Sequence, residues 1–207
     1  AGGFVSAPVY SSVSGTVKAI EPRRTAVGDM VDSIIIENDG NYTEMEYEEI
    51  EDVSSLSKEE IIDKIREAGI VGMGGAGFPT HVELSPKEPE KIEYIIANCA
   101  EREPYLTSDY RRMVEQPEKL VEGMRIILQL FPHAKGVFGV EDNKPDCIQK
   151  LRELTAGEDR MTVVPLMTKY PQGAEKQLIQ VVTGRKVGPG KLPYQVGCIV
   201  LNIDTCC

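Results

Sequence analysis

The chain has 207 residues, 41% of them hydrophobic and 27% charged, with 33 Asp and Glu against 23 Lys and Arg for a formal net charge of −10. This length accommodates one domain with a sizeable core and a small appended module. The acidity argues against nucleic acid as a partner, and no apolar run approaches the roughly 18 residues of a membrane-spanning helix. We therefore expect no direct membrane insertion.

The first fifty residues have the pattern of short β-strands. Apolar and polar residues alternate over 9–22 and again over 32–38, and turn signals stand at Gly15, at Gly28 and at residues 38–40. This segment is too small to bury much apolar surface by itself, so it is expected to be an appended module.

A helix is predicted to begin after Ser57, because Ser57 and Glu60 have the spacing of a capping box. Apolar residues recur through 61–68 at helical spacing and form a single stripe. Gly69 follows the last of them and is expected to end the helix as its C′ residue.

Strand and helix patterns then alternate to residue 207, and this order favours a three-layer α/β domain with a mainly parallel sheet. The predicted strands cover 92–97, 136–140, 161–166 and 196–203, and the predicted helices cover 117–131, 144–154 with Asn143 as its cap, and 174–182 closed by Gly184.

The cysteines do not form a disulfide framework, because they are odd in number and contain no C-x-x-C pair. We expect reduced thiols in a cytoplasmic protein, mostly buried as small apolar residues, and no metal site within this chain. They are Cys99, Cys147, Cys198, Cys206 and Cys207.

A glycine-rich segment, Gly72, Gly74, Gly75 and Gly77, matches the pattern G-x-G-x-x-G. Missing side chains let backbone N–H groups approach a phosphate closely. The segment follows a helix, whereas the dinucleotide fingerprint follows a strand, so an ordinary NAD site is disfavoured. A phosphate cradle of another architecture remains, with Phe78 offering a flat apolar face to a ring system; the alternative is a turn without a ligand.

A polar cluster follows the predicted strand 92–97 and contains Asn98, Glu101, Glu103 and Asp109. Ligands of open α/β sheets bind beyond the carboxyl ends of the strands. Asn98 offers both a donor and an acceptor for an amide edge, and the two glutamates can accept hydrogen bonds from ribose hydroxyls. The alternative is a solvated acidic loop.

A third cluster spans residues 170–176 and continues to Tyr194. Glu175 lies in the first turn of its predicted helix, where complementarity to the helix dipole would explain it without a ligand. Lys191 is a candidate for neutralising a cofactor phosphate, and an exposed solvated lysine is the equally simple interpretation.

Four motifs carry a resemblance to a known family: GMGGAGFPTHVEL, NCAEREPYLTSDYR, YPQGAEKQLIQVVTGRKVGPGKLPY and LNIDT, in this order. Together they resemble the RnfC component of the Rnf electron-transport complex, including the RnfC-like proteins associated with proline reductase, and more distantly the flavin subunit of respiratory complex I. The resemblance implies a Rossmann-like domain of the complex I flavin-subunit type over 51–207, which binds FMN and NADH. Residues 1–50 would be a partial lipoyl-like β-sandwich segment.

The resemblance also implies a role for each candidate residue, with hydride passing from NADH to the flavin and no side chain acting as a catalytic acid or base. Gly72, Gly74, Gly75 and Gly77 would line FMN, Asn98 and Asp109 would hydrogen-bond it, Asn202 and Thr205 would reach its ribityl–phosphate side, Phe78 and Tyr194 would sandwich NADH rings, and Glu101, Glu175 and Lys191 would orient the dinucleotide.

The family's partners are the other subunits of a membrane-bound complex or a ferredoxin-type carrier, which implies a cytoplasmic position at the inner face of the membrane. The sequence departs from the family pattern where Glu83 replaces a lysine, where Arg102 separates Glu101 from Glu103, and where Cys99 replaces a small residue. The cysteines that ligate two [4Fe–4S] clusters in the family are missing, so we expect the ligand-binding-loop and iron–sulfur domains to lie outside this chain. The alternative function is a docking subunit that has lost flavin binding through Glu83.

Overall fold

The structure is a computed structural model that describes residues 3–47, 49–101, 103 and 105–207. Contacts divide the chain into two units, one formed by residues 9–51 and the other by residues 1–8 and 52–207. Within the described residues, no helix has both the length and the apolar character needed to cross a bilayer.

The smaller unit contains an antiparallel hairpin of β1 (Gly15–Arg24) and β2 (Met30–Asn38), with a register shift between Val17 and Ala19. Gly28 adopts a φ of 100° in the connecting turn, as expected from its place between the strands. The assignment of Gly15 to a turn was wrong. It lies inside β1, where an added Cβ would overlap the carbonyl oxygen of Glu37, so glycine is needed for close approach of the strands.

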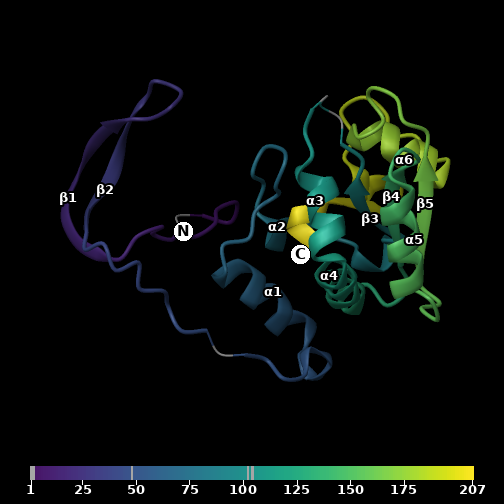
Figure 1. The fold of residues 1–207 in the computed structure, drawn as a ribbon, viewed down its shortest axis with the longest axis horizontal. Coiled ribbons are helices and arrows are strands. Elements are labelled where there is room, and N and C mark those ends of the chain that lie inside the picture. Colours follow the sequence, from purple (N-terminus) through teal and green to yellow (C-terminus); the bar gives the residue numbers. More distant parts are fainter. Residues whose placement is uncertain (1–2, 48, 102, 104) are drawn as a thin grey trace. The chain divides into compact units, whose positions relative to one another are not determined.

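The larger unit is built on four parallel strands, which confirms the predicted parallel sheet, and the structure gives their order as β5-β4-β3-β6 (Figure 1). β3 lies between β4 and β6, so Ile96 pairs with both Val137 and Val200. The strands are β3 (Tyr94–Cys99), β4 (Lys135–Glu141), β5 (Met161–Leu166) and β6 (Cys198–Asn202).

Helices cover both faces of this sheet, which confirms the three-layer α/β fold. Ile95 packs into a core with Leu120 and Met124 on one face, whereas Ile96 packs with Leu178 on the other. The helices are α1 (Lys58–Glu67), α2 (Thr80–Glu83), α3 (Ser108–Glu115), α4 (Pro117–Leu130), α5 (Pro145–Leu154), α6 (Glu175–Thr183) and α7 (Ile203–Cys206), with 3-10 turns at Val53–Ser55, Pro89–Lys91 and Pro193–Val196.

Most predicted helix ends are confirmed by their capping contacts. Ser57 and Glu60 form the reciprocal capping box of α1, and Gly69 follows that helix with a φ of 69°. Gly184 ends α6 in the left-handed conformation. The cap of α5 was wrong, because the N-cap residue is Lys144 rather than Asn143, and no side chain caps that helix.

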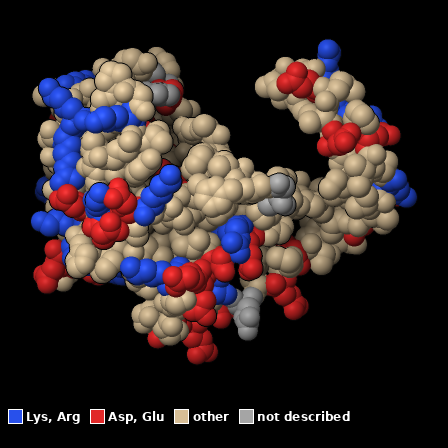
Figure 2. All heavy atoms as spheres, turned by 180° about the vertical axis from the view of Figure 1, so that it is seen from behind, with Lys and Arg blue, Asp and Glu red and all other residues tan. Residues whose placement is uncertain are grey.

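Charged side chains are not spread evenly over the surface. Figure 2 shows basic side chains along one edge of the larger unit and a mixture of acidic and basic ones below them. The segment 176–203 contains four Lys or Arg residues and no Asp or Glu, although the whole chain carries a net charge of −10. These four residues lie in α6 and in the segment between α6 and β6, which therefore has a local positive bias in its sequence.

The packing of α7 against α4 depends on a missing side chain. An added Cβ on Gly123, in the middle of α4, would overlap the carbonyl oxygen of Cys206 in α7. A helix-interior glycine costs roughly 1 kcal/mol relative to alanine, so this position is retained for the close approach of two backbones.

We expect Gly123→Ala to destabilise the larger unit by about 2–3 kcal/mol, because a backbone oxygen cannot rotate away from the new methyl group. For a chain of this size the loss corresponds to a lower Tm by about 5–10 °C, measurable by circular dichroism. The exposed neighbour Lys119→Ala is the matched control and should leave Tm nearly unchanged. An unchanged Tm for Gly123→Ala would contradict the close packing.

Candidate functional site

The glycine-rich segment forms a closed loop between α1 and α2. The N–H of Gly72 donates to the carbonyl of Phe78 at 2.7 Å, and the N–H of Thr80 donates to the carbonyl of Ile70 at 3.1 Å. These two bonds join the start and the end of the loop.

Residues from the carboxyl end of β6 anchor this loop. The N–H of Met73 donates to Thr205 Oγ1 at 2.9 Å. A Cβ on Gly74 would lie 3.0 Å from Nδ2 of Asn202, and the φ of Gly74 is 70°. Thr205 is therefore a structural anchor of the loop, and the tight packing at Gly74 holds the backbone against Asn202.

A cavity of about 580 Å³, here called the glycine-loop cavity, lies between the loop and the carboxyl ends of β3 and β6. Its lining brings together ten of the predicted site residues: Gly72, Gly74, Gly75, Phe78, Asn98, Glu101, Glu103, Asp109, Glu175 and Asn202. Four sequence segments that are far apart thus meet in one place. Arg102, which separates the two glutamates in the sequence, lies outside the described residues.

A second cavity of about 370 Å³, here called the Tyr194 cavity, adjoins the first. Phe78, Glu83 and Glu175 line both cavities, and Tyr194 lines the second. The two predicted ring-binding side chains, Phe78 and Tyr194, therefore face the same space. Lys87 is the basic side chain among the residues that line it.

The remaining predicted residues line neither cavity. Gly77 has a φ of 66°, so its glycine serves the shape of the loop. Thr205 lies behind the loop, bonded to Met73. The backbone N–H of Lys191 closes a turn onto Gly188, and its side chain lines neither cavity.

Gly75 provides a test of whether the cavity fits a bound flat or phosphate-bearing group. Its φ lies outside the left-handed region, and an added Cβ would meet no atom of the chain within 4 Å. Neither backbone strain nor internal packing therefore explains glycine here. Because Gly75 lines the cavity, the absent side chain fits a ligand lying directly against the backbone.

The glycine-loop cavity is strongly acidic. Five carboxylates line it, and none of the described residues in its lining is Lys or Arg: Glu83, Glu101, Glu103, Asp109 and Glu175. Burial and the charge of Glu175 raise the pKa of Glu83 to about 7. Burial and the charge of Glu101 raise the pKa of Asp109 to about 6, and burial also raises the pKa of Glu175. A proton on Glu83 therefore reduces the negative charge of the cavity near neutral pH.

Two predicted ligand contacts are already engaged by the protein itself. Asn98 donates from Nδ2 to the carbonyl of Gly173 at 2.9 Å and accepts at Oδ1 from the N–H of Ala100 at 3.2 Å. Glu101 accepts at Oε1 from the N–H groups of Asp109 at 3.0 Å and Tyr110 at 3.4 Å. Both side chains hold the walls of the cavity in place.

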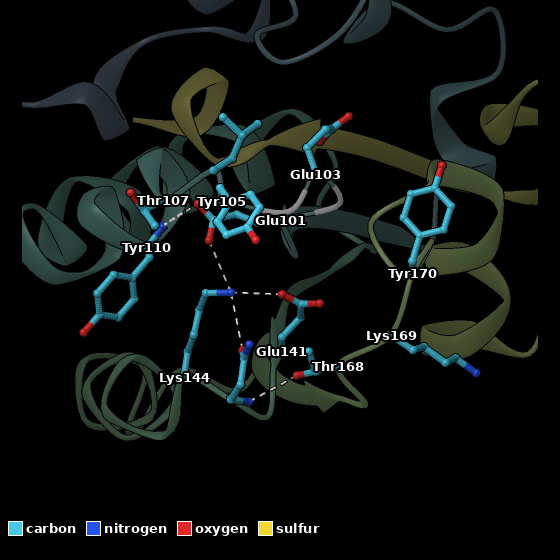
Figure 3. Close-up of a pocket in the computed structure, with 12 residues that line it drawn as sticks. Glu101, Glu103, Tyr105, Thr107, Tyr110, Glu141, Lys144, Thr168, Lys169 and Tyr170 are labelled. Carbon is cyan, nitrogen blue, oxygen red and sulfur yellow. Dashed lines mark hydrogen bonds and ion pairs between the residues drawn. The ribbon is translucent and has the colours of Figure 1, made fainter.

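Glu101 also borders a third cavity of about 440 Å³, here called the Lys144 cavity (Figure 3). Lys144 points from the start of α5 toward two carboxylates, with Nζ 2.9 Å from Glu141 Oε2 and 3.3 Å from Glu101 Oε2. All three side chains are less than 10% exposed. Sequence reasoning missed this cluster, because a lysine in a helical pattern next to Asn and Pro gives no sign of burial.

Comparisons with known proteins identify the family and the fold of the chain. The Nuo51 FMN-binding domain family matches residues 65–207, and the RnfC barrel sandwich hybrid domain matches residues 1–41. The C subunit of the Na⁺-translocating ferredoxin:NAD⁺ oxidoreductase complex of Acetobacterium woodii is 46% identical over 204 residues, covering 98% of this chain and 46% of that protein.

Other relatives extend the comparison. The C subunit of the proton-translocating ferredoxin:NAD⁺ oxidoreductase complex of Clostridium ljungdahlii is 46% identical, over 98% of this chain and 44% of that protein. The chain thus spans less than half the length of these curated relatives. An NAD⁺-reducing [NiFe]-hydrogenase in the air-oxidised state aligns with a TM-score of 0.62 and 25% identity, over 72% of this chain and 29% of that one.

The raised pKa of Glu83 predicts a stability that falls as pH rises. The folded protein keeps the proton up to about pH 7, whereas the unfolded chain releases it near its ordinary value of 4.5, so stability is lost between these two values. We expect Glu83→Gln to raise Tm at pH 8 by a few degrees, with the gain shrinking toward pH 5, in thermal unfolding series.

The exposed Glu90→Gln is the matched control for this series and should not change the pH dependence. A gain in Tm for Glu83→Gln that is equal at pH 5 and pH 8 would contradict the burial of a carboxyl group at this position.

Proposed function

Since the chain belongs to the Nuo51 FMN-binding domain family and is a homologue of the RnfC component of Rnf-type oxidoreductase complexes, we propose that it is the FMN- and NADH-binding module of such a component. In this role it passes electrons between NAD(H) and ferredoxin-type iron–sulfur carriers. The observation that carries the proposal is Gly75, which lines the cavity and where an added Cβ would meet no atom of the chain within 4 Å.

In this proposal the glycine-loop cavity holds FMN, which supplies hydride and single-electron chemistry when bound. The open backbone at Gly75 accepts the flat or phosphate-bearing part of the group, and Asn202 borders it from the end of β6. Asn98 and Glu101 keep the opposite wall in position through their bonds to backbone groups. The chain's own contribution is therefore placement of the reactants.

NADH would enter through the Tyr194 cavity, which shares Phe78 with the flavin site. Phe78 is 44% exposed and Tyr194 is 40% exposed, so a ligand can stack on both aromatic rings without any rearrangement of the core. Lys87 lines this cavity, and the segment 176–203 adds positive charge nearby, both of which favour a dinucleotide with two phosphates. Lys191 belongs to this segment and stays a proposed phosphate partner.

The relatives also guide the proposals on assembly. We infer partners among the other subunits of a membrane-bound complex or a ferredoxin-type carrier, and a position at the cytoplasmic face of the membrane. Residues 1–50 would form the partial lipoyl-like segment, supported by the match to the RnfC barrel sandwich hybrid domain, and residues 51–207 the FMN- and NADH-binding domain. Residues outside this chain would hold the [4Fe–4S] clusters.

Gly75→Val should lower FMN affinity at least about 100-fold, because the branched side chain occupies the space against the backbone where the ligand lies. The measurement is quenching of FMN fluorescence on titration with protein. Gly188→Val is the matched control: that glycine also has no left-handed φ, a Cβ there makes only ordinary contact, and it lines neither cavity. FMN binding that survives Gly75→Val would remove the loop from the site.

Tyr194→Ala should weaken NADH binding about tenfold while FMN binding stays unchanged, since Tyr194 lines only the cavity assigned to the dinucleotide. The measurement is the NADH concentration for half-maximal bleaching of the bound flavin under anaerobic conditions. Equal effects on FMN and NADH would contradict the separate assignment of the two cavities.

The acidic lining of the glycine-loop cavity favours one competing function, a docking subunit that binds no flavin. The FMN titration decides between them. Binding of FMN by the wild-type chain supports the redox module, and no binding at millimolar FMN would refute it in favour of the docking role. Glu83→Lys adds a further test, because charge reversal should tighten FMN binding if Glu83 faces the phosphate.

A further inference from the structure

Lys144 is a buried cation that the proposed redox chemistry does not use. Its ammonium lies 2.9 Å from Glu141 Oε2, 3.3 Å from Glu101 Oε2 and 3.4 Å from Asn143 Oδ1. An ammonium has three N–H donors, so these three acceptors use all of them. Lys144 therefore offers no free donor to a ligand in the Lys144 cavity. Its role follows from the side chains that it binds, Glu101 above all.

The two carboxylate oxygens of Glu101 have different partners. Oε2 faces Lys144, and Oε1 accepts from the N–H groups of Asp109 and Tyr110 in the first turn of α3. The N-cap residue of α3 is Thr107, whose side chain makes no capping bond. Glu101 therefore supplies the cap of this helix from the end of β3, in place of the local residue.

The start of α3 is part of the candidate site. Ser108 and Asp109 line the glycine-loop cavity, and Glu101 lines both that cavity and the Lys144 cavity. Glu101 thus contacts the N–H of Asp109 with one carboxylate oxygen and Lys144 with the other. Figure 3 shows Lys144 below, Glu101 above it and Glu141 to one side, joined by the ion pairs.

We propose that Lys144 is a positioning residue of the candidate flavin site: its ion pair orients Glu101 so that Glu101 caps α3 and holds Asp109 at the wall of the glycine-loop cavity. The inference rests on the proposed function where it concerns FMN. The contact between Glu101 and α3 is tested separately below.

The ion pair with Lys144 explains how Glu101 keeps its orientation. Without Lys144, Oε2 of Glu101 would lose its cationic partner, and the Glu101 side chain would no longer be held with Oε1 toward α3. A carboxylate that turns away from the helix makes no charge-assisted hydrogen bonds to its two N–H groups. The first turn of α3 would then lose its cap, and Asp109 would lose its fixed position.

The first measurement needs no ligand. Hydrogen exchange of the amides of Asp109 and Tyr110 reports directly on their bonds to Glu101. Lys144→Met should accelerate both amides at least about tenfold, as should Glu101→Gln, and combining the two changes should add little. Lys144→Arg keeps the charge and should restore most of the protection. Unchanged exchange in Lys144→Met would overturn the proposal.

The second measurement is FMN affinity in the same variants. Lys144→Met should weaken FMN binding about tenfold or more, and the exposed Lys150→Met should not. Glu141→Gln combined with Lys144→Met restores the net charge of the cluster. If Lys144 serves only to neutralise Glu141, this pair regains wild-type affinity and the proposal is refuted; if Lys144 positions Glu101, the affinity stays low.

The two arms separate the two proposals. Faster exchange at Asp109 and Tyr110 without any FMN binding by the wild-type chain supports the role of Lys144 in capping α3 and refutes the flavin function. FMN binding by the wild-type chain with equal affinity in Lys144→Met supports the flavin function and refutes the positioning role.

Discussion

The hydrogen bond from the N–H of Met73 to Thr205 Oγ1 is the contact on which the candidate site depends. The glycine loop precedes the sheet in the chain and follows α1, so no strand of the sheet leads into it. This bond joins the glycine loop to α7, the short helix that follows β6. The helix α7 itself packs closely against α4 at Gly123. A contact between residues 132 positions apart thus places the loop opposite the carboxyl ends of β3 and β6.

The electrostatics of the site follow from what those strand ends contribute. The described lining residues supply five carboxylates and no Lys or Arg, so backbone N–H groups are the donors available to an anion there. The raised pKa values of Glu83 and Asp109, about 7 and 6, mean that the site is partly protonated near neutral pH. An anionic group bound there would favour proton uptake by Glu83, one of the carboxylates that line both cavities.

The alternation of strands and helices could be predicted because each apolar run matches its own period, as in the full agreement at 161–166. Predictions of helix N-termini from neighbouring residues were wrong where a residue distant in the sequence contacts the start of the helix. Asn143 has the chemistry of a cap, yet the buried pairing of Lys144 with Glu101 and Glu141 draws the next residue into the N-cap position. The helix α3 was missed for the same reason, because its first turn is capped by Glu101, seven residues before it begins.

In the candidate site, too, the residue type could be predicted from the sequence but the contacts of the side chain could not. Sequence patterns identified Asn98 and Glu101 as polar residues at a strand end, but their hydrogen bonds go to the protein's own backbone. Gly75 is the opposite case, because nothing inside the chain accounts for it. A residue whose atoms are all used internally shapes a site, and a residue without an internal explanation points to what enters it. On that criterion Gly75 is the strongest argument for a ligand in the glycine-loop cavity. Lys144 is fully paired inside the protein, and in our proposal it affects that cavity only through Glu101.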